Sequence, residues 1–340
     1  MVQVLLACLN AISSKILGVK YFISILLVLS VFAPTHAQTD SLLVSDTAFH
    51  WLTLVREHPQ KSFSPDIPPG NFSGITPLGD GLYAVVDDKK GDGFYVFKLR
   101  FNKRGSVTSA YNIGFYTSGL VNRDAEDIVY MPSSKTFFIS GEVNNDVLEY
   151  SLVGQRTIRE LKVPEVFRKA QANQGLEPLA YNESTHLFWT TSESTLKGDS
   201  LHRLQSFGED MQPREQFPYQ MDKPISTDYR ERTHGVSAMT ALDDGSLLVL
   251  EREAFISHNK IGSWVNCKIY QVFPQRSLEK HLIHEWKTTM TLLQQNFANY
   301  EGMCLGPVLK DGSQVILLIS DSQNQYYGIL RDWFKTLVVK

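Results

Sequence analysis

The chain repeats one pattern of apolar and polar positions five times. Each copy begins with a small or acidic residue, continues as a short apolar segment, passes through a polar turn, and ends as a second apolar segment followed by an acid. Short apolar runs bounded by turn residues are typical of strands joined in β-hairpins. We therefore expect five hairpins, over residues 73–88, 126–142, 177–193, 235–251 and 301–321.

The spacing of these hairpins predicts an all-β β-propeller. Successive copies start 51 to 66 residues apart, and a further strand often follows a hairpin, as at residues 93–99, 146–150 and 267–273. Periods near about 50 residues with three or four strands are typical of propeller blades. The alternative interpretation is a β-sandwich in which the five hairpins are coincidental.

Five blades are explicit in the sequence, and the length of the chain suggests a sixth. We expect this blade to be closed by strands from both ends of the chain, such as residues 49–55 with residues 326–330. Residues 194–233 contain three prolines and predict outer strands with a long loop. No stretch within residues 38–340 resembles a linker, so we expect a single domain.

Residues 1–37 have the pattern of a secretory signal peptide. Lys15 and Lys20 precede an apolar run over residues 21–32, and Thr35-His36-Ala37 places small residues where a signal peptidase cleaves. The alternative is a membrane anchor, but the run is shorter than the roughly 20 residues that span a bilayer. We predict cleavage after Ala37, a secreted or periplasmic protein, and no membrane span in the mature chain.

Composition narrows the choice of partners. The chain of 340 residues has 33 Lys+Arg against 36 Asp+Glu and contains no long basic run, so we expect no nucleic-acid partner. We expect a monomer. Beyond the signal peptide the cysteines are Cys267, in an expected outer strand, and Cys304, in an expected innermost strand. This separation favours two buried thiols over a disulfide.

Acidic residues recur at the strand ends of the predicted hairpins. Their pairs are Glu126/Glu142, Glu177/Glu193, Gly235/Glu251 (with glycine in the first position) and Glu301/Asp321. The start of one antiparallel strand and the end of the next lie at the same edge of a sheet, so each pair faces one end of the propeller. If the first strand of each blade lines the channel, Glu126, Glu177 and Glu301 form a carboxylate ring at its mouth. Glu142, Glu193, Glu251, Asp321 and the pair Asp87-Asp88 then lie just outside it.

Such a ring favours a bound cation, because gathered carboxylates repel one another and raise each other's pKa. Ca²⁺ is the natural occupant, since it takes about six to eight oxygen ligands in a flexible arrangement. Mg²⁺ needs a tighter octahedron, and Zn²⁺ prefers His or Cys ligands that the ring lacks. The alternative is that the acids are structural and cap turns at strand ends.

Three further residues are candidates for chemistry. His234 lies at the head of an inner strand and is a candidate general base or phosphate donor. Arg123 and Arg252 are candidates to bind an anion, although such residues also serve as salt-bridge partners. The chain has no Gly-x-Ser-x-Gly elbow, no His-Glu-x-x-His and no P-loop.

Several short motifs resemble the phytase-like family, also described as "esterase-like activity of phytase". They are Asp124-Ala125-Glu126-Asp127-Ile128, Gly175-Leu176-Glu177-Pro178-Leu179, Gly235-Val236-Ser237-Ala238, Leu250-Glu251-Arg252, and Tyr300-Glu301-Gly302-Met303 with Leu318-Ile319-Ser320-Asp321. They occur in the family's order from about residue 72 to about residue 330. The resemblance implies an exported bacterial protein with a propeller-type repeat.

The chain also departs from that family. In that family a glycine usually follows the acid. Here Asp127 follows Glu126 and Pro178 follows Glu177, and among the three acids only Glu301 is followed by a glycine, Gly302. Both changes alter the freedom of the backbone at the channel mouth. A more distant resemblance is to calcium-dependent lactonase propellers. Their metal-ligating Glu heads a strand as Glu177 and Glu301 do.

These observations leave two main hypotheses. The first is an exported hydrolase of phosphate or carboxylate esters, with Ca²⁺ on Glu126, Glu177 and Glu301, His234 or Glu251 relaying a proton, and Arg123 and Arg252 orienting a small anionic ester. The hydrolase activity is implied by the resemblance, and the acid ring comes from the residues. The second is a non-catalytic propeller that binds a ligand or a protein at that face, or holds only a structural cation.

Overall fold

A computed structural model describes residues 49–171, 173–228, 230–293 and 296–340. The predicted signal peptide, residues 1–37, lies outside these described residues. Residues His50–Lys340 form one compact unit. Within the described part of the chain, no helix has the length and apolar character needed to cross a membrane.

The described strands form five sheets of four antiparallel strands, and each sheet is one propeller blade. From the inside outward, blade 1 consists of β2 (Phe72–Gly79), β3 (Leu82–Asp87), β4 (Gly93–Phe101) and β5 (Val107–Thr117). Blade 2 consists of β6 (Ala125–Met131), β7 (Thr136–Gly141), β8 (Asp146–Ser151) and β9 (Arg156–Glu160). Blade 3 consists of β10 (Leu176–Asn182), β11 (Leu187–Ser192), β12 (His202–Gly208) and β13 (Pro213–Tyr219). Blade 4 consists of β14 (Arg232–Ala241), β15 (Leu247–Phe255), β16 (Trp264–Val272) and β17 (Lys280–Thr289). Blade 5 consists of β18 (Asn299–Val308), β19 (Gln314–Asp321), β20 (Phe334–Val339) and β1 (Leu54–Glu57). Short 3-10 helices are η1 (Glu165–Lys169), η2 (Pro274–Arg276) and η3 (Tyr326–Gly328).

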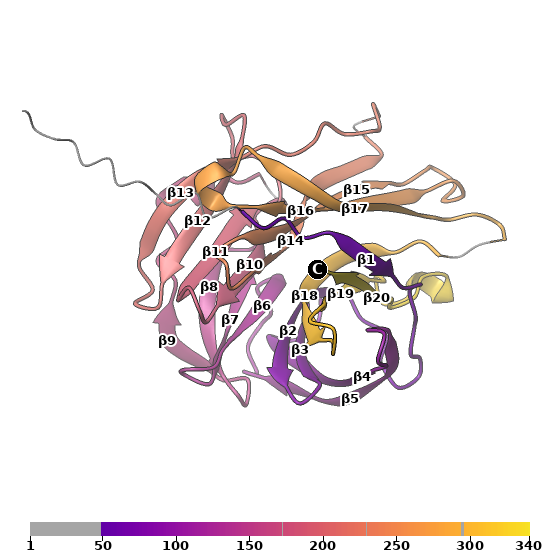
Figure 1. The fold of residues 1–340 in the computed structure, drawn as a ribbon, viewed down its shortest axis with the longest axis horizontal. Helices are drawn as coiled ribbons and strands as arrows, with labels where there is room; N and C mark the ends of the chain where they lie inside the picture. Colours follow the sequence, from indigo (N-terminus) through magenta and orange to yellow (C-terminus); the bar gives the residue numbers. More distant parts are fainter. Residues whose placement is uncertain (1–48, 172, 229, 294–295) are drawn as a thin grey trace, which may run out of the picture. The chain divides into compact units, whose positions relative to one another are not determined.

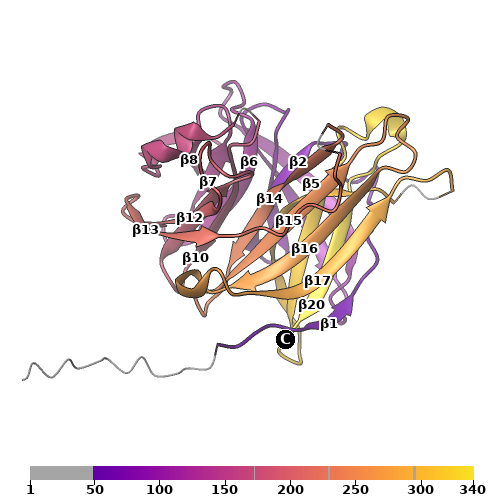
Figure 2. The ribbon, with the colours of Figure 1, turned by 90° about the horizontal axis from the view of Figure 1, so that it is seen from above.

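The innermost strands β2, β6, β10, β14 and β18 surround a central channel. Each contacts the innermost strands of both neighbouring blades, and all five lie near the centre of Figure 1. Figure 2 shows the four strands of blade 4 side by side. A cavity of about 370 Å³ opens at one end of the channel and is lined by residues from all five innermost strands. The predicted all-β propeller is therefore confirmed.

The expectation of six blades is wrong, because the described residues form five blades, one for each repeat seen in the sequence. The two ends of the chain do not build a separate blade. Instead β1 pairs with β20 and becomes the outermost strand of blade 5, beside the C-terminus in Figure 1. The expected strand over residues 326–330 is not formed, and η3 occupies this segment. Long outer strands and connecting loops account for the length that suggested a sixth blade.

The apolar core lies between the blades. One buried cluster fills each of the five interfaces; between blades 1 and 2, for example, Ala84 and Phe94 pack with Ile128 and Phe137. The second strand of each blade is apolar at successive positions because both of its faces meet a neighbouring blade. Cys267 and Cys304 are buried, separate thiols, which confirms the preference for no disulfide.

Candidate functional site

Every blade has a register shift at the same end of its innermost strand. The shifts lie between Phe72 and Gly74, Ala125 and Ile128, Leu176 and Leu179, Val236 and Ala238, and Tyr300 and Gly302. A bulge of this kind leaves a residue outside the regular pairing and redirects its side chain. In each blade, one residue immediately follows the position at which the register shift begins. These five equivalent residues are Ser73, Glu126, Glu177, Ser237 and Glu301.

The second strand of each blade passes beside this bulge, ending there in blades 1, 2, 3 and 5 and continuing to Phe255 in blade 4, and it delivers a second equivalent set. Its members are Asp88, Glu142, Glu193, Arg252 and Asp321. The pairing predicted for blade 4 is therefore wrong, because Val236 lies opposite Glu251. Ser237, not Gly235, corresponds to Glu126, and Arg252, not Glu251, corresponds to Glu142. The sequence spacing misled because β14 begins earlier than its counterparts and the bulge shifts the register.

The structure brings Glu126, Glu177 and Glu301 together. Burial is the main cause that raises the pKa of all three, and the charge of Glu301 adds to it at both Glu126 and Glu177. The pKa of Glu301 is raised to about 7, although the guanidinium of Arg252 opposes the rise. Carboxylates that raise each other's pKa in this way need a proton or a cation to be stable together.

The outer acids share this environment. Burial, with the neighbouring carboxylates, raises the pKa of Asp321, Glu142 and Asp88. One carboxylate oxygen of Asp88 is buried without a hydrogen-bond partner among the described residues. We define the acidic mouth as Asp88, Asp124, Glu126, Glu142, Glu177, Glu193, Glu301 and Asp321.

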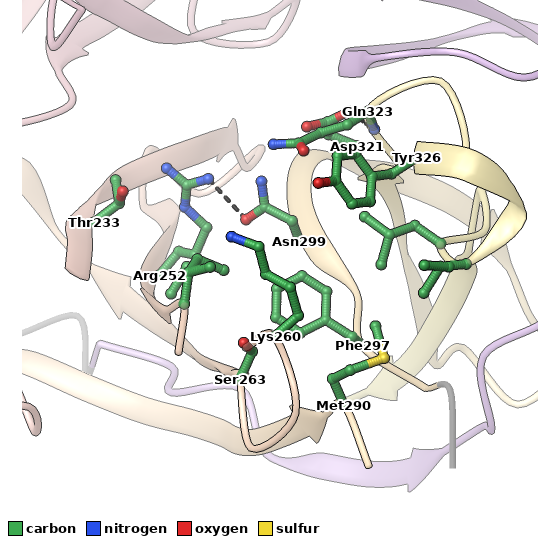
Figure 3. A pocket seen from close by; sticks show the side chains of 14 residues that line it. Thr233, Arg252, Lys260, Ser263, Met290, Phe297, Asn299, Asp321, Gln323 and Tyr326 are labelled. Carbon is green, nitrogen blue, oxygen red and sulfur yellow. Dashed lines mark hydrogen bonds between the residues drawn. The ribbon is translucent and has the colours of Figure 1, made fainter. Parts of the chain in front are cut away.

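Arg252 neutralises one side of the acidic mouth. It is only 4% exposed, and its guanidinium donates to Glu193 and to Glu301 over 2.6 Å each. The same nitrogen that reaches Glu301 also reaches the side-chain oxygen of Asn299 at 2.8 Å, as Figure 3 shows. Two carboxylates on one guanidinium make this a buried ion-pair network rather than an open anion site.

Gly235 makes room for this network. A Cβ atom at Gly235 would lie 2.3 Å from Cγ of Glu193 and 2.8 Å from its carbonyl oxygen. A side chain at position 235 would therefore collide with Glu193. Because Gly235 has no side chain, Glu193 can occupy this space and accept the hydrogen bond from Arg252.

The other side of the mouth can hold a metal ion. Ligand oxygens of Asp124, Glu126 and Glu142 all lie within 4.8 Å of one another, and all three residues are half-buried. Glu142 is positioned by a 2.8 Å hydrogen bond from the backbone NH of Gly175, and Asp124 by Lys89 at 2.6 Å. A set of carboxylate oxygens alone suits a hard cation such as Ca²⁺.

Only part of the predicted metal set lies in this group. Glu126 belongs to it, whereas Glu177 and Glu301 lie in the acidic mouth outside it. Sequence reasoning missed Asp124 as a ligand candidate, although this acid stands two residues before Glu126. It also missed Asp127, whose buried carboxylate accepts hydrogen bonds from the backbone NH groups of Ile128 and Leu179 and so joins β6 to β10.

The remaining candidates lie among other partners. Arg123 is buried in blade 2, where it pairs with Asp146 and donates to the carbonyl oxygen of Ile139 at 3.1 Å. A role for Arg123 in binding substrate stays a prediction.

Two further candidates have partners outside the acidic mouth. Glu251 accepts hydrogen bonds from the hydroxyl of Tyr219 at 2.6 Å and from Lys280 at 2.5 Å. His234 lies opposite Glu253 in the β14–β15 register, and burial lowers its pKa. The structure therefore does not bring Glu251 or His234 to the Asp124–Glu126–Glu142 group, and their proton-relay roles stay predictions.

Comparison with known proteins gives one family match. A family model described as "Phytase-like: Esterase-like activity of phytase" matches residues 67–323. No curated protein matches the chain.

Several solved structures resemble the fold at low identity. A thermostable family-43 glycoside hydrolase has 6% identity over 82% of this chain and 92% of its own, with a TM-score of 0.48. An endo-arabinase from Bacteroides thetaiotaomicron VPI-5482 has 11% identity over 82% and 98%, with a TM-score of 0.47. A streptogramin B lyase has 13% identity over 84% and 98%, with a TM-score of 0.39.

Proposed function

The chain belongs to the phytase-like family, and from that membership we propose that it hydrolyses phosphate or carboxylate esters with a divalent cation held at the acidic mouth. The family description supports the ester chemistry. The single observation that supports the cation is the group of carboxylate oxygens of Asp124, Glu126 and Glu142 within 4.8 Å. The carboxylates of Glu301, Asp88, Glu142 and Asp124 add to burial in raising the pKa of Glu126, and a bound cation would relieve their repulsion.

Ca²⁺ is the cation we propose, with Asp124, Glu126 and Glu142 as its protein ligands. A bound cation of this kind would polarise the ester and acidify a bound water. Glu177 and Glu301 line the same mouth and hold protons more tightly than ordinary carboxyls. With its pKa near 7, Glu301 can accept or release a proton at neutral pH, which is the property a general acid–base group needs.

The substrate, location and assembly proposed here rest on the sequence. We propose a small-molecule ester as substrate, export to a secreted or periplasmic location with cleavage after Ala37, and a monomer. The predicted preference for an anionic ester rested on Arg123 and Arg252. Both arginines have carboxylate partners within the protein, so they do not favour an anionic ester.

A second function has one observation in its favour. Because Arg252 pairs with Glu193 and Glu301, two of the eight acids of the mouth have a basic partner without a metal. That arrangement also suits a non-catalytic propeller that binds a ligand, or one in which the cation is only structural.

The substitution Glu126→Gln tests the proposal. It removes one ligand charge, so we expect Ca²⁺ affinity, measured by isothermal titration calorimetry, to fall by about tenfold or more. Hydrolysis of 4-nitrophenyl phosphate or 4-nitrophenyl acetate should need Ca²⁺ in the wild type and fall with it. In EDTA the variant should be more stable than the wild type to urea, because the substitution relieves carboxylate repulsion.

The matched control is Asp66→Asn, which removes an exposed carboxylate that is not part of the acidic mouth. It should leave Ca²⁺ binding and turnover unchanged. Stoichiometric Ca²⁺ with no turnover of either ester would reject the hydrolase and favour a structural cation. Turnover that is unchanged by EDTA and by Glu126→Gln would reject the metal site.

A further inference from the structure

A second cavity lies beside the acidic mouth, between blades 4 and 5. It has a volume of about 280 Å³, close to the lower end of small-molecule pockets, which begins at roughly 300 Å³. Its walls come from the ends of β14, β15, β18 and β19, the β15–β16 turn, and the segment around η3 (Figure 3). We call this cavity the blade 4–5 pocket.

Most of the blade 4–5 pocket is apolar. Its apolar walls consist of Ala254, Ile256, Met290, Phe297, Ile329 and Leu330. The rim adds exposed apolar side chains, since Ile261 lies in the turn that supplies Lys260 and Ser263, and Tyr327 contacts Tyr326. An apolar cavity with an apolar rim favours an uncharged organic group over water.

The pocket is continuous with the acidic mouth through shared residues. Arg252, Asn299 and Asp321 line it, and the first two bind Glu301 at 2.6 and 2.7 Å. A ligand in the pocket therefore lies next to the carboxylates of the mouth.

Arg252, which lines the pocket, carries an unused donor. Nε of Arg252 is buried and has no hydrogen-bond partner among the described residues, although both terminal nitrogens of the guanidinium are bonded. A buried donor without a partner is costly, and an acceptor oxygen of a ligand would satisfy it. Because Glu193 and Glu301 already neutralise Arg252, this donor suits an uncharged carbonyl or ether oxygen better than an anion.

We propose that the blade 4–5 pocket binds the apolar part of an uncharged carboxylate ester, with an ester oxygen at Nε of Arg252 and the reacting group facing the acidic mouth. This inference rests on the proposed ester hydrolysis and names its substrate class. The charges agree with it: the eight acids of the mouth outnumber the nearby basic groups, which are Arg252, Lys89 and the Lys260 that lines the pocket, so a polyanionic ester would meet net repulsion. A neutral ester does not.

Two variants that fill the pocket test this assignment from opposite walls. Thr233→Trp acts from blade 4 and Ile329→Trp from blade 5, and both replace exposed or half-exposed side chains that line the cavity. The control is Ile158→Trp, at a fully exposed position on β9 outside the pocket. Unchanged thermal unfolding of all three variants confirms that each folds.

Binding is measured by calorimetry with hexanamide and acetamide, which are neutral amides that the proposed reaction does not consume. Each buried methylene strengthens binding by about fourfold, so hexanamide should bind the wild type about tenfold or more tightly than acetamide. Both filling variants should lose this preference and the control should keep it. Equal binding of the two amides, or a preference that survives both filling variants, overturns the pocket assignment.

Turnover separates this proposal from the proposed function. The wild type should show a lower KM for 4-nitrophenyl hexanoate than for 4-nitrophenyl acetate, and both filling variants should raise KM for the hexanoate alone. If hexanamide binds as expected but no ester is hydrolysed, the hydrolase fails and the pocket stands. If both esters are hydrolysed with equal KM and hexanamide does not bind, the pocket fails and the hydrolase stands.

Discussion

At the scale of single residues, the two sides of the acidic mouth have different basic partners. Arg252 serves Glu193 and Glu301 on one side. On the other side the basic group is Lys89, which is 60% exposed in its side chain and pairs with Asp88 and Asp124 rather than with Glu126. Surface pairs of this kind contribute little, about 0–1 kcal/mol, so the charge of Glu126 stays largely uncompensated without a metal.

The raised pKa of Glu301 predicts how stability depends on pH. A carboxyl whose folded pKa exceeds its ordinary value keeps its proton longer in the folded protein than in the unfolded chain. Folding stability in EDTA should therefore fall as pH rises from about the ordinary 4.5 through the folded value of about 7. The slope from one such group reaches at most about 1.4 kcal/mol per pH unit.

Urea unfolding in EDTA between pH 5 and pH 8 measures this slope. Glu301→Gln should flatten it, and Asp66→Asn should leave it unchanged. Ca²⁺ should reduce the loss at high pH, because the cation replaces protons among the carboxylates. A wild-type slope equal to that of Glu301→Gln would show that Glu301 does not titrate in this range.

At the scale of strands, the bulge at the head of each innermost strand decides which side chains meet. It places Glu126, Glu177 and Glu301 in equivalent positions of blades 2, 3 and 5. In blades 1 and 4 the residues at this position are Ser73 and Ser237. Ser73 donates to the carbonyl oxygen of Ala125, and Ser237 to that of Tyr300. Where a serine stands in place of the acid, its hydroxyl therefore links the innermost strands of neighbouring blades and adds no charge to the mouth.

Gly235→Ala tests the path of Glu193 across β14. The added Cβ meets Cγ and the backbone oxygen of Glu193, so the strand or the ion pair has to move. Overpacking of this kind costs about 1–3 kcal/mol of unfolding free energy. Urea unfolding should show this loss.

Gly114→Ala is the matched control in a strand, because its Cβ would meet only the ring of Tyr116 at 3.8 Å. A loss in Gly235→Ala no larger than in Gly114→Ala would mean that Glu193 adapts freely.

At the scale of the whole described fold, β1 closes the ring of blades. It pairs with β20, so residues near the start of the described chain complete the blade that holds its end. The closure joins segments that are distant in sequence, and a cross-link there removes a large amount of chain entropy from the unfolded state.

A disulfide between β1 and β20 should stabilise the propeller. Arg56 and Val338 are register partners, so the double substitution Arg56→Cys with Val338→Cys places two thiols on adjacent strands. We expect a gain of about 2–4 kcal/mol in urea unfolding. The native Cys267 and Cys304 are buried and apart, which limits mispairing. The gain should disappear with reductant and be absent in Arg56→Cys alone, and no gain in the oxidised protein would argue against this closure.

The sequence by itself determined the repeat, the presence of one hairpin in each blade and the presence of acids at one end of the strands. These features depend on local alternation, turn residues and spacing, which can be read along the chain. The Glu126, Glu177 and Glu301 set could be named for the same reason, because each acid heads an apolar strand.

Only the tertiary structure decided the blade number, the closure by β1, and the roles of Asp124 and Arg252 within the mouth. Closure depends on pairing between the two ends of the chain, and no local pattern records which distant strand a segment joins. The bulge in blade 4 shifts the register by an amount that spacing cannot show, so Arg252 was predicted to bind an anion although it occupies the position equivalent to Glu142. Which carboxylates share a cation, and which share a guanidinium, follows from how the five blades meet around the channel.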